Sequence, residues 1–429
     1  MEELRATVLA SGAEVRDYVA RRALRPGPVG RVGVELELFV LDPADPVRIP
    51  GPDELRDVLG AGAAVEMPGG SRLTFEPGGQ LELSGPPLTG PEAAVAALEV
   101  DLAAIAGRLA VAGLALRGGA LEATRVPYRW VRGRRYDAMA AHFRGCGPQC
   151  EAAGAVMMTA TAALQLNLDA GVDEAHAEMR WQRAHVLAPT LAAMFAASPV
   201  LSGRPSGAAS GRLAAWQALD RCRTAPVFGD PTVSAGQEWA RYALDATVFL
   251  PAVGEPGSGA TSFTLRQWAD DPAVGGRRLT SADVDEHLTT LFPPIRPRGF
   301  VELRYLDGQQ LDVWPVAVAV VSTLHDDPRV APTAAEACLG VAGHWAQAAQ
   351  IALADPDLAC TARDLTELAI GSLIRRRVSS TLIERVEAFA DRYVRRERTP
   401  ADDVDLRSLS IALSPVADGS GGPVFVPAS

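Results

Sequence analysis

Four stretches of the chain alternate apolar and polar residues, which is the pattern of β-strands with one buried face. In Arg31–Leu41, apolar side chains occupy every second position, while Glu35 and Glu37 lie on the opposite face. The other three stretches place mainly charged and amide side chains on one face; they are Gln80–Ser84, Thr161–Asp169 and Arg298–Leu306. One-sided strands favour an antiparallel sheet whose apolar face is covered by helices. The predicted fold class is therefore α+β.

Longer stretches with helical spacing surround these strands. They cover residues 1–26, 91–116, 173–197, 334–354 and 377–396. Thr89, followed by Glu92 three positions later, predicts a capping box for the second of these helices. We expect a single domain over residues 1–429, with the informative motifs at 30–330, a helical C-terminal part at 331–398 and a flexible tail at 399–429.

The polar face of the predicted sheet contains more acidic residues than an ordinary solvent-exposed strand face. Glu82 follows the two glutamates of the first strand, and on the last strand Glu302 and Arg304 face away from Tyr305. Like charges directly opposed across a sheet destabilise it. Divalent cations between the carboxylates would remove that cost, and Mg²⁺ prefers such oxygen ligands. A solvated strand face is the alternative, since Glu-x-Glu alone is common on exposed strands.

A turn is predicted between two of the acidic positions. Pro77-Gly78-Gly79 separates Glu76 from Glu82, and this run of residues breaks or reverses a strand. The segment therefore indicates a hairpin with one carboxylate at the turn and another on the returning strand.

Composition narrows the classes of protein. The 429 residues are 48% hydrophobic, enough for a large core, and the net charge of −11 disfavours non-specific binding to nucleic acid or to a membrane surface. No apolar stretch is long enough to span a bilayer and no signal peptide opens the chain, so a cytoplasmic location is expected. The sequence contains no lysine, which excludes a Walker A phosphate loop and a Schiff-base lysine.

Five cysteines are too few and too scattered for a disulfide scaffold. Cys146 and Cys150 lie four residues apart in the loop Gly-Cys-Gly-Pro-Gln-Cys. This pair could be a redox pair, a metal-binding pair or two ordinary thiols in a reducing compartment, and the sequence leaves all three possibilities open.

The segment Phe75-Glu-Pro-Gly-Gly-Gln-Leu-Glu-Leu-Ser84 resembles the signature of the plant and bacterial glutamate–cysteine ligases. Further motifs follow in the family's order: Gly33–Glu37, Gln165–Asp169, Ser198-Pro199 with Arg212, Asp220–Thr224, Tyr242–Asp245, Arg266–Trp268, His287–Pro293, and Arg296–Arg304 with Asp307. The Arg-Pro-Arg-Gly form of the last motif resembles the branch of the family that serves ergothioneine biosynthesis.

The resemblance implies a glutamine-synthetase-like fold, in which a curved antiparallel sheet cradles ATP, L-glutamate, L-cysteine and several Mg²⁺ ions. It also implies a reaction in which ATP phosphorylates the γ-carboxylate of glutamate and the amine of cysteine then displaces phosphate from γ-glutamyl phosphate. Nucleic acid and membrane are not expected as partners, and a monomer or homodimer is expected.

Carried over by position, the resemblance implies five metal ligands: Glu35, Glu37, Glu76, Glu82 and Glu302. It implies that Arg304 faces the transferred phosphate beside Glu302, and that Arg212 holds the glutamate substrate. Further substrate-binding candidates are Arg296, Arg298, Arg223, Tyr242, Trp268, Gln165 and Asn167. Because lysine is absent, arginine forks are the expected partners for phosphate and carboxylate groups.

Three other functions remain open. A related carboxylate–amine ligase would use a different amine, and a kinase on the same sheet would stop at the phosphorylated product. A non-catalytic binding protein would keep the fold alone, but the complete acidic set argues against it.

Overall fold

The computed structural model describes residues 7–60, 67–227, 232–249 and 262–404. Within these ranges an eight-stranded antiparallel sheet follows the order β2–β3–β1–β6–β10–β9 along its main path, with β4 and β5 paired to opposite ends of β1. Its strands are β1 (Arg31–Leu41), β2 (Arg72–Phe75), β3 (Leu81–Ser84), β4 (Leu88–Thr89), β5 (Ala115–Arg117), β6 (Ala163–Leu168), β9 (Ile295–Pro297) and β10 (Val301–Asp307). A separate short hairpin joins β7 (Val200–Leu201) and β8 (Arg204–Pro205).

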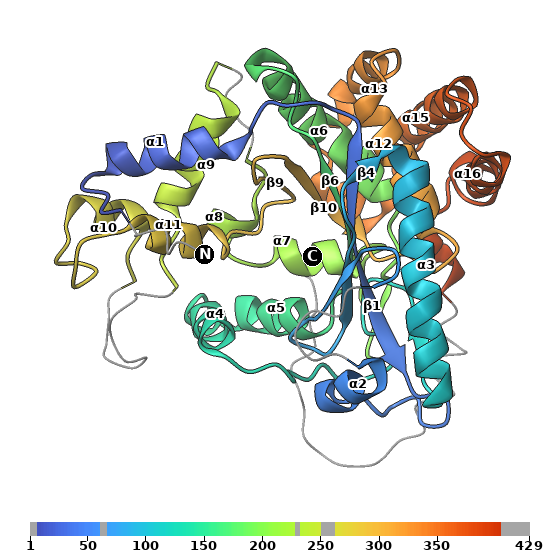
Figure 1. Cartoon of the computed structure of the whole chain (residues 1–429), viewed down its shortest axis with the longest axis horizontal. Coiled ribbons are helices and arrows are strands. Elements are labelled where there is room, and N and C mark those ends of the chain that lie inside the picture. Colours follow the sequence, from blue (N-terminus) through green and yellow to red (C-terminus); the bar gives the residue numbers. More distant parts are fainter. Residues whose placement is uncertain (1–6, 61–66, 228–231, 250–261, 405–429) are drawn as a thin grey trace.

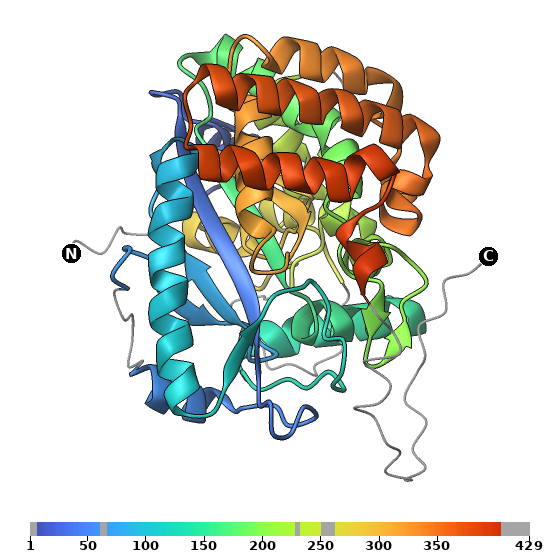
Figure 2. The same ribbon diagram turned by 90° about the vertical axis from the view of Figure 1, so that its right-hand side faces the viewer.

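Helices cover the apolar face of the sheet, as the strand pattern predicts. The helices in contact with the sheet are α3 (Gly90–Val111), α6 (Glu174–Met194) and α12 (Trp314–Asp326). Behind them lie α15 (Pro356–Arg375) and α16 (Ser380–Arg392), which form an outer layer (Figures 1 and 2). The side chains of Leu36, Leu38 and Leu166 are fully buried in the resulting core. The α+β class with an open antiparallel sheet is thereby confirmed.

A second group of helices stands across from the polar face of the sheet (Figure 1). It comprises α1 (Gly12–Ala23), α4 (Arg134–Gly145), α5 (Pro148–Thr159), α7 (Gly211–Gln217), α8 (Arg221–Thr224), α9 (Ala235–Asp245), α10 (Leu265–Asp270) and α11 (Ser281–Leu288). The remaining elements are α2 (Pro52–Leu59), α13 (Ala331–Cys338), α14 (Trp345–Gln350) and the 3₁₀ turns Leu339–Val341, Ala352–Ala354, Val394–Arg396 and Pro400–Asp403. The polar strand face therefore looks into a space enclosed by helices instead of into open water.

Two local predictions are wrong. The continuous helix over 334–354 is broken, because α13 ends at Cys338 and α14 begins only at Trp345, with Gly340 and Gly343 in the interruption. The side chain of Thr89 caps no helix, since its residue pairs with β1. Glu92 instead accepts a hydrogen bond from the backbone of Ser379.

The structure describes only part of the N-terminal and C-terminal segments for which the sequence predicts a helix and a flexible tail. Residues 1–6 of the predicted first helix and residues 405–429 of the predicted tail lie outside the described residues. The division into a single domain stays a prediction. In the described part of the chain, no helix combines the length and the hydrophobicity that crossing a bilayer requires.

A buried histidine on α11 makes the fold sensitive to acid. His287 Nε2 donates a hydrogen bond to the Ala243 carbonyl at 2.9 Å, because a carbonyl oxygen can only accept. Burial, reinforced by the positive charge of Arg223, lowers the pKa of His287 to about 3 from 6.5. As the pH falls below 6.5, the unfolded chain binds this proton before the folded chain does. Stability should therefore fall from about pH 6.5 toward pH 3, by about 1.4 kcal/mol per pH unit from this group.

His287→Gln should remove this part of the acid sensitivity while keeping a donor near Ala243. Urea unfolding at about pH 7 and about pH 5.5 should show a smaller loss of stability in the variant than in the wild type, by about 1 kcal/mol. Equal losses in the two proteins would mean that His287 is not held neutral by the fold.

Candidate active site

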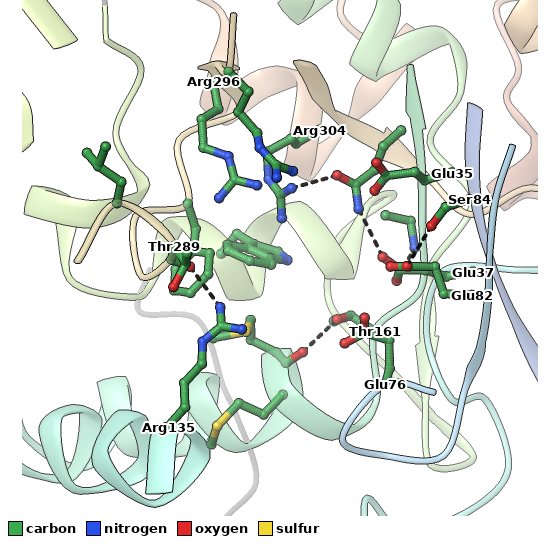
Figure 3. A pocket seen from close by; sticks show the side chains of 18 of the residues that line it. Glu35, Glu37, Glu76, Glu82, Ser84, Arg135, Thr161, Thr289, Arg296 and Arg304 are labelled. Carbon is green, nitrogen blue, oxygen red and sulfur yellow. Dashed lines mark hydrogen bonds between the residues drawn. The ribbon is translucent and has the colours of Figure 1, made fainter. Parts of the chain in front are cut away.

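A cavity of about 570 Å³ lies against the polar face of the sheet. Its walls come from β1, the β2–β3 hairpin, β6, β9 and β10 on one side, and from α1, α4, α5, α7, α9 and α11 on the other. Eight arginines and five acids line it. Figure 3 shows the glutamates gathered on the wall formed by the sheet, with Arg296, Arg304 and Arg135 on the other sides. A cavity with one acidic wall and an arginine rim suits a ligand that carries several anionic groups together with cations.

Strand register assembles the acidic wall. In the β1–β3 pairing Glu37 lies directly opposite Glu82, and Glu35 lies opposite Ser84. Glu76 reaches the same place from the turn that connects β2 to β3. Carboxylate oxygens of Glu37, Glu76 and Glu82 all lie within 4.8 Å of one another. The structure thus brings together three of the predicted metal ligands, with Glu35 beside them in the same cavity.

Two glycines hold the turn that presents Glu76. The Gly79 amide donates to the Glu76 carbonyl at 2.8 Å, and Gly79 has a φ of +88°. At Gly78, an added Cβ would lie 2.0 Å from the carbonyl oxygen of Thr159. The turn therefore packs directly onto the end of α5, which fixes the position of Glu76 relative to the strands.

We expect Gly78→Ala to displace this turn and to cost about 1–3 kcal/mol of stability, as overpacking against backbone does. Activity should fall with it, because Glu76 moves away from Glu37 and Glu82. The comparison is with Gly107→Ala, where an added Cβ on α3 meets nothing within 4 Å. That control should be stabilised slightly by the better helix propensity of alanine. Wild-type stability in Gly78→Ala would show that the turn can move at no cost.

The electrostatics of the acidic wall indicate a missing positive charge. Burial and the neighbouring Glu82 raise the pKa of Glu37 to about 7. Burial and the charges of Glu37 and Glu82 raise the pKa of Glu76 well above its usual range, and burial also raises the pKa of Glu35. Buried carboxylates that lack a counterion take up protons in this way. A cation would reverse these shifts, so the residues present fit divalent metal ions with oxygen ligands.

Glu302 has different surroundings from the other predicted ligands. Arg296 donates to it at 2.6 Å and Arg298 at 3.1 Å, and Arg304 lies 3.3 Å away. Burial alone would raise the pKa of Glu302, but these three arginines hold it well below its usual range. The structure does not place Glu302 within the group of three close carboxylates, and its fully buried side chain instead orients the arginines of β9 and β10.

A bulge in β10 sets the position of Arg304. Leu303 pairs with Leu166 and Leu306 with Leu164, so Arg304 and Tyr305 together oppose the single residue Gln165. The predicted alternation therefore holds as far as Arg304, which contacts Glu302, and ends at Tyr305, which lies with Arg304 in the wall of a second cavity of about 550 Å³. A bulge adds one residue to one strand only, which a single strand's pattern does not reveal.

Gln165 connects the arginine side of the site to the acidic wall. Its Oε1 accepts a hydrogen bond from Arg304 Nη1 at 2.6 Å, and its Nε2 donates to Glu37 Oε1 at 3.1 Å. The Glu37 carboxylate also accepts the backbone N–H of Ala163 at 2.8 Å. Gln165 therefore fixes the separation of Arg304 and Glu37, and both of its polar ends are occupied.

Arg212 offers a buried donor at the boundary between the two cavities. It lines both of them, and its Nη2 donates to the Arg304 carbonyl at 2.8 Å. Its buried Nη1 has no hydrogen-bond partner among the described residues and lies 3.9 Å from Asp307 Oδ1. A buried guanidinium N–H without a partner is costly, so an anionic group of a ligand is its natural complement.

The other predicted substrate residues are only partly brought together. Arg296 and Arg298 line the cavity, and Asn167 donates to Glu35 at 2.9 Å without being among the lining residues. Arg223 is fully buried, stacks 3.4 Å from the Phe249 ring and donates to Thr290. The structure therefore does not bring Arg223 to the cavity wall.

Two predicted aromatic contacts also lie away from the cavity. Trp268 is buried in the core, where its Nε1 donates to the Arg277 carbonyl at 2.8 Å. Tyr242 stacks on Trp239 with ring centroids 5.7 Å apart, and of these two rings only Trp239 lines the cavity. The sequence around a single aromatic residue does not show whether that residue packs in the core or lines a pocket.

Several cavity residues have no distinctive sequence signal. They are Arg22 and Arg25 at the end of α1, Arg72 on β2, Arg135 on α4 and Trp216 on α7. Arg135 donates to the Thr289 carbonyl at 2.7 Å and so ties α4 to the chain after α11. In the sequence, only the use of arginine in place of lysine indicates that arginines bind the substrates. That feature does not show which arginines line the cavity.

The chain is similar to known ligases over nearly its whole length. It is 42% identical to the glutamate–cysteine ligase EgtA of Mycolicibacterium smegmatis over 414 residues, 95% of each chain, and 40% identical to that of Mycobacterium tuberculosis, over 96% of this chain and 94% of the relative. The chloroplastic glutamate–cysteine ligase of Arabidopsis thaliana is 30% identical over 56% of this chain and 46% of its own. A crystal structure of the Francisella tularensis glutamate–cysteine ligase in complex with AMP is 14% identical, with a TM-score of 0.48 over 88% of this chain and 84% of that one.

The family comparison covers the sheet, both groups of helices except α1, and every residue of the cavity from β1 onward. The model of glutamate-cysteine ligase family 2 (GCS2) matches residues 31–393. That range includes the three close glutamates, Arg212 and the β9–β10 arginines. This chain therefore belongs to glutamate-cysteine ligase family 2.

Proposed function

We propose that this chain is an ATP-dependent glutamate–cysteine ligase that forms γ-glutamylcysteine for ergothioneine biosynthesis. The observation that carries the proposal is one cavity in which three close glutamates face a rim of arginines. The two mycobacterial relatives, matched over 94–95% of their length, bear the name of this activity. The proposal includes the predicted cytoplasmic location and a monomer or homodimer.

The acidic wall is the proposed site for Mg²⁺. Glu37, Glu76 and Glu82 would hold metal, with Glu35 close by, since their carboxylate oxygens lie within 4.8 Å of one another, the pKa values of Glu37 and Glu76 are raised, and none of the three forms an ion pair within the described part of the chain. When bound there, Mg²⁺ neutralises negative charge on the phosphates of ATP and on the transferred group. Glu302 stays a predicted ligand, but its contacts favour a role in orienting Arg296 and Arg304.

The arginines supply the remaining charge complementarity. Arg304 is held by Gln165 and Glu302 at the border of the acidic wall, where its other N–H groups can meet the phosphoryl group in transfer. Arg212 has a buried N–H without a partner and is suited to a carboxylate of glutamate. Both side chains are fixed by contacts within the protein, so they are oriented before substrate binds.

Phosphorylation should precede attack by the amine. A carboxylate is a poor electrophile, because direct attack would have to expel oxide. Transfer of the terminal phosphoryl group of ATP turns one γ-carboxylate oxygen into a leaving group. The cysteine amine then attacks the acyl carbon, the C–O bond breaks, and phosphate leaves as the amine loses a proton. No cysteine or histidine is among the described residues that line the cavity, so neither of these nucleophiles is available there for a covalent acyl-enzyme.

An oxygen-labelling experiment tests this order of events. With glutamate carrying ¹⁸O in its γ-carboxylate, we expect one labelled oxygen to appear in inorganic phosphate for each peptide bond formed. The reason is that the bridging oxygen of the acyl phosphate leaves with phosphorus. Mass spectrometry of the released phosphate gives the readout. Label in AMP together with pyrophosphate, or phosphate without label, would reject the acyl phosphate.

The function itself is tested with a panel of amines. Glutamate, ATP and Mg²⁺ are incubated with the full chain and with cysteine or another amine, and products are identified by mass. We expect γ-glutamylcysteine and ADP, with cysteine preferred over serine and 2-aminobutyrate. Preference for another amine would assign a different carboxylate–amine ligase. ADP formed equally well without any amine would assign a kinase, and no ADP under any condition would reject the enzyme.

A further inference from the structure

A second group of potential metal ligands lies outside the cavity. Among the described residues it is, with the glutamates of the acidic wall, one of two groups whose ligand atoms all lie within 4.8 Å of one another. It consists of His142, Cys146 and Asp220. His142 Nε2 lies 3.0 Å from Asp220 Oδ2 and 3.4 Å from Cys146 Sγ. One imidazole nitrogen is therefore aimed at a carboxylate and a thiol together.

These separations, 3.0 and 3.4 Å, are slightly shorter than those between ligands of a tetrahedral site, so a bound ion would move the ligands apart by a few tenths of an ångström. Zinc ligands at the usual bond lengths would place nitrogen about 3.4 Å from oxygen and about 3.6 Å from sulfur. Cys150, in the first turn of α5, lies near Cys146 but is not among the three residues whose ligand atoms all lie within 4.8 Å of one another, so its thiol is a candidate fourth ligand that would have to move toward the ion. Imidazole and thiol groups select thiophilic cations, in contrast to the all-oxygen wall of the cavity.

Surrounding contacts hold the ligands in place. Asp220 caps α8, and its Oδ1 accepts the backbone N–H of Cys222 at 2.9 Å, which leaves Oδ2 directed at His142. The His142 ring packs against Phe249 with centroids 4.5 Å apart. Both His142 and Asp220 are largely buried, with side chains 14% and 16% exposed, whereas Cys146 is exposed and leaves a path for an ion.

We propose that His142, Cys146 and Asp220, with Cys150 as fourth ligand, form a binding site for a thiophilic divalent cation such as Zn²⁺. The ion would join the end of α4 and the start of α5 to the start of α8. Both thiols lose their protons on binding, and no electrons are transferred. Because α4 also carries Arg135 and Tyr136 into the cavity, the site would fix one wall of the active site without touching substrate.

Cobalt is the probe, because Co²⁺ bound to thiolate in a tetrahedral site absorbs strongly in the visible and shows sulfur-to-metal charge transfer. The full-length chain is stripped with chelator, kept reduced and titrated with Co²⁺, followed by Zn²⁺. We expect one equivalent to produce both kinds of band and Zn²⁺ to abolish them. Ions held by carboxylates alone give no sulfur band, so binding at the acidic wall is distinguished.

Variants locate the site. Cys146→Ser should weaken the sulfur band, because only the Cys150 thiolate remains, and should bind Co²⁺ at least tenfold more weakly; His142→Gln should also bind at least tenfold more weakly. Cys146 is exposed, so the serine variant should fold, which circular dichroism verifies. The matched control is Cys360→Ser, an exposed cysteine on α15 that should leave the spectrum unchanged. A wild-type protein without the bands, or bands and Co²⁺ affinity that are unchanged in both Cys146→Ser and His142→Gln, would overturn the proposal.

Discussion

Glu76→Gln should reduce turnover at least a hundredfold and leave the fold as stable as before, or more stable. The turnover loss follows from removing a proposed metal ligand, since loss of even an outer partner of a metal site costs about 10–100-fold. The stability result follows from the raised pKa of Glu76, which arises because burial and its acidic neighbours disfavour its charge. A neutral amide of the same shape should remove that repulsion. Steady-state rates, and urea unfolding without metal, give the two readouts.

Glu37→Gln and Glu82→Gln should show the same loss of turnover and a higher requirement for Mg²⁺. Glu99→Gln is the matched control, because Glu99 is an exposed acid paired with Arg385 on the far side of the sheet. It should be active. Near-normal turnover in Glu37→Gln, Glu76→Gln and Glu82→Gln together would contradict the metal site, whatever their stability.

Arg304→Lys should be nearly as inactive as Arg304→Ala, with kcat/KM lower by roughly 10²–10³-fold in both variants. The guanidinium uses Nη1 for Gln165 and approaches Glu302 with the same atom, which leaves other N–H groups for a phosphoryl oxygen. A lysine ammonium is a single point donor on a flexible chain and cannot hold this fork. Initial rates at varied ATP separate an effect on binding from one on transfer.

Arg385→Lys serves as the control for this substitution, because Arg385 forms an exposed ion pair that lysine can also make. It should keep wild-type kinetics. If Arg304→Lys retained most activity while Arg304→Ala did not, Arg304 would supply only general positive charge, and the oriented fork would be the wrong explanation.

The sequence by itself determined four of the eight strands, β1, β3, β6 and β10, and the side of the sheet on which the chemistry lies. Side chains alternate between the two faces of a strand, so Glu35 and Glu37 lie on the same face of Arg31–Leu41 independently of the rest of the chain. The structure confirms a strand, β1, over these residues. The run Pro77-Gly78-Gly79 predicts the turn for a reason that is also local, since it depends on backbone conformations that glycine allows. The absence of lysine is a property of the sequence alone.

Only the tertiary structure decided which side chains meet. The register of β1 against β3 sets Glu37 opposite Glu82, and the bulge in β10 sets Arg304 and Tyr305 against Gln165. Both depend on pairings between segments far apart in the chain, and a shift of one residue would have sent each side chain to the other face.

Dependence on contacts between distant segments also explains why the sequence patterns and motifs did not predict the positions of several residues relative to the cavity. Trp268 and Arg223 are buried, while Arg135 reaches the cavity from a helix that carries no motif. Burial depends on what packs against a residue, and that is set by long-range contacts. For Glu302, the strand's own alternation predicted Arg304 as a neighbour, whereas Arg296 became a visible partner only when β9 folded against β10.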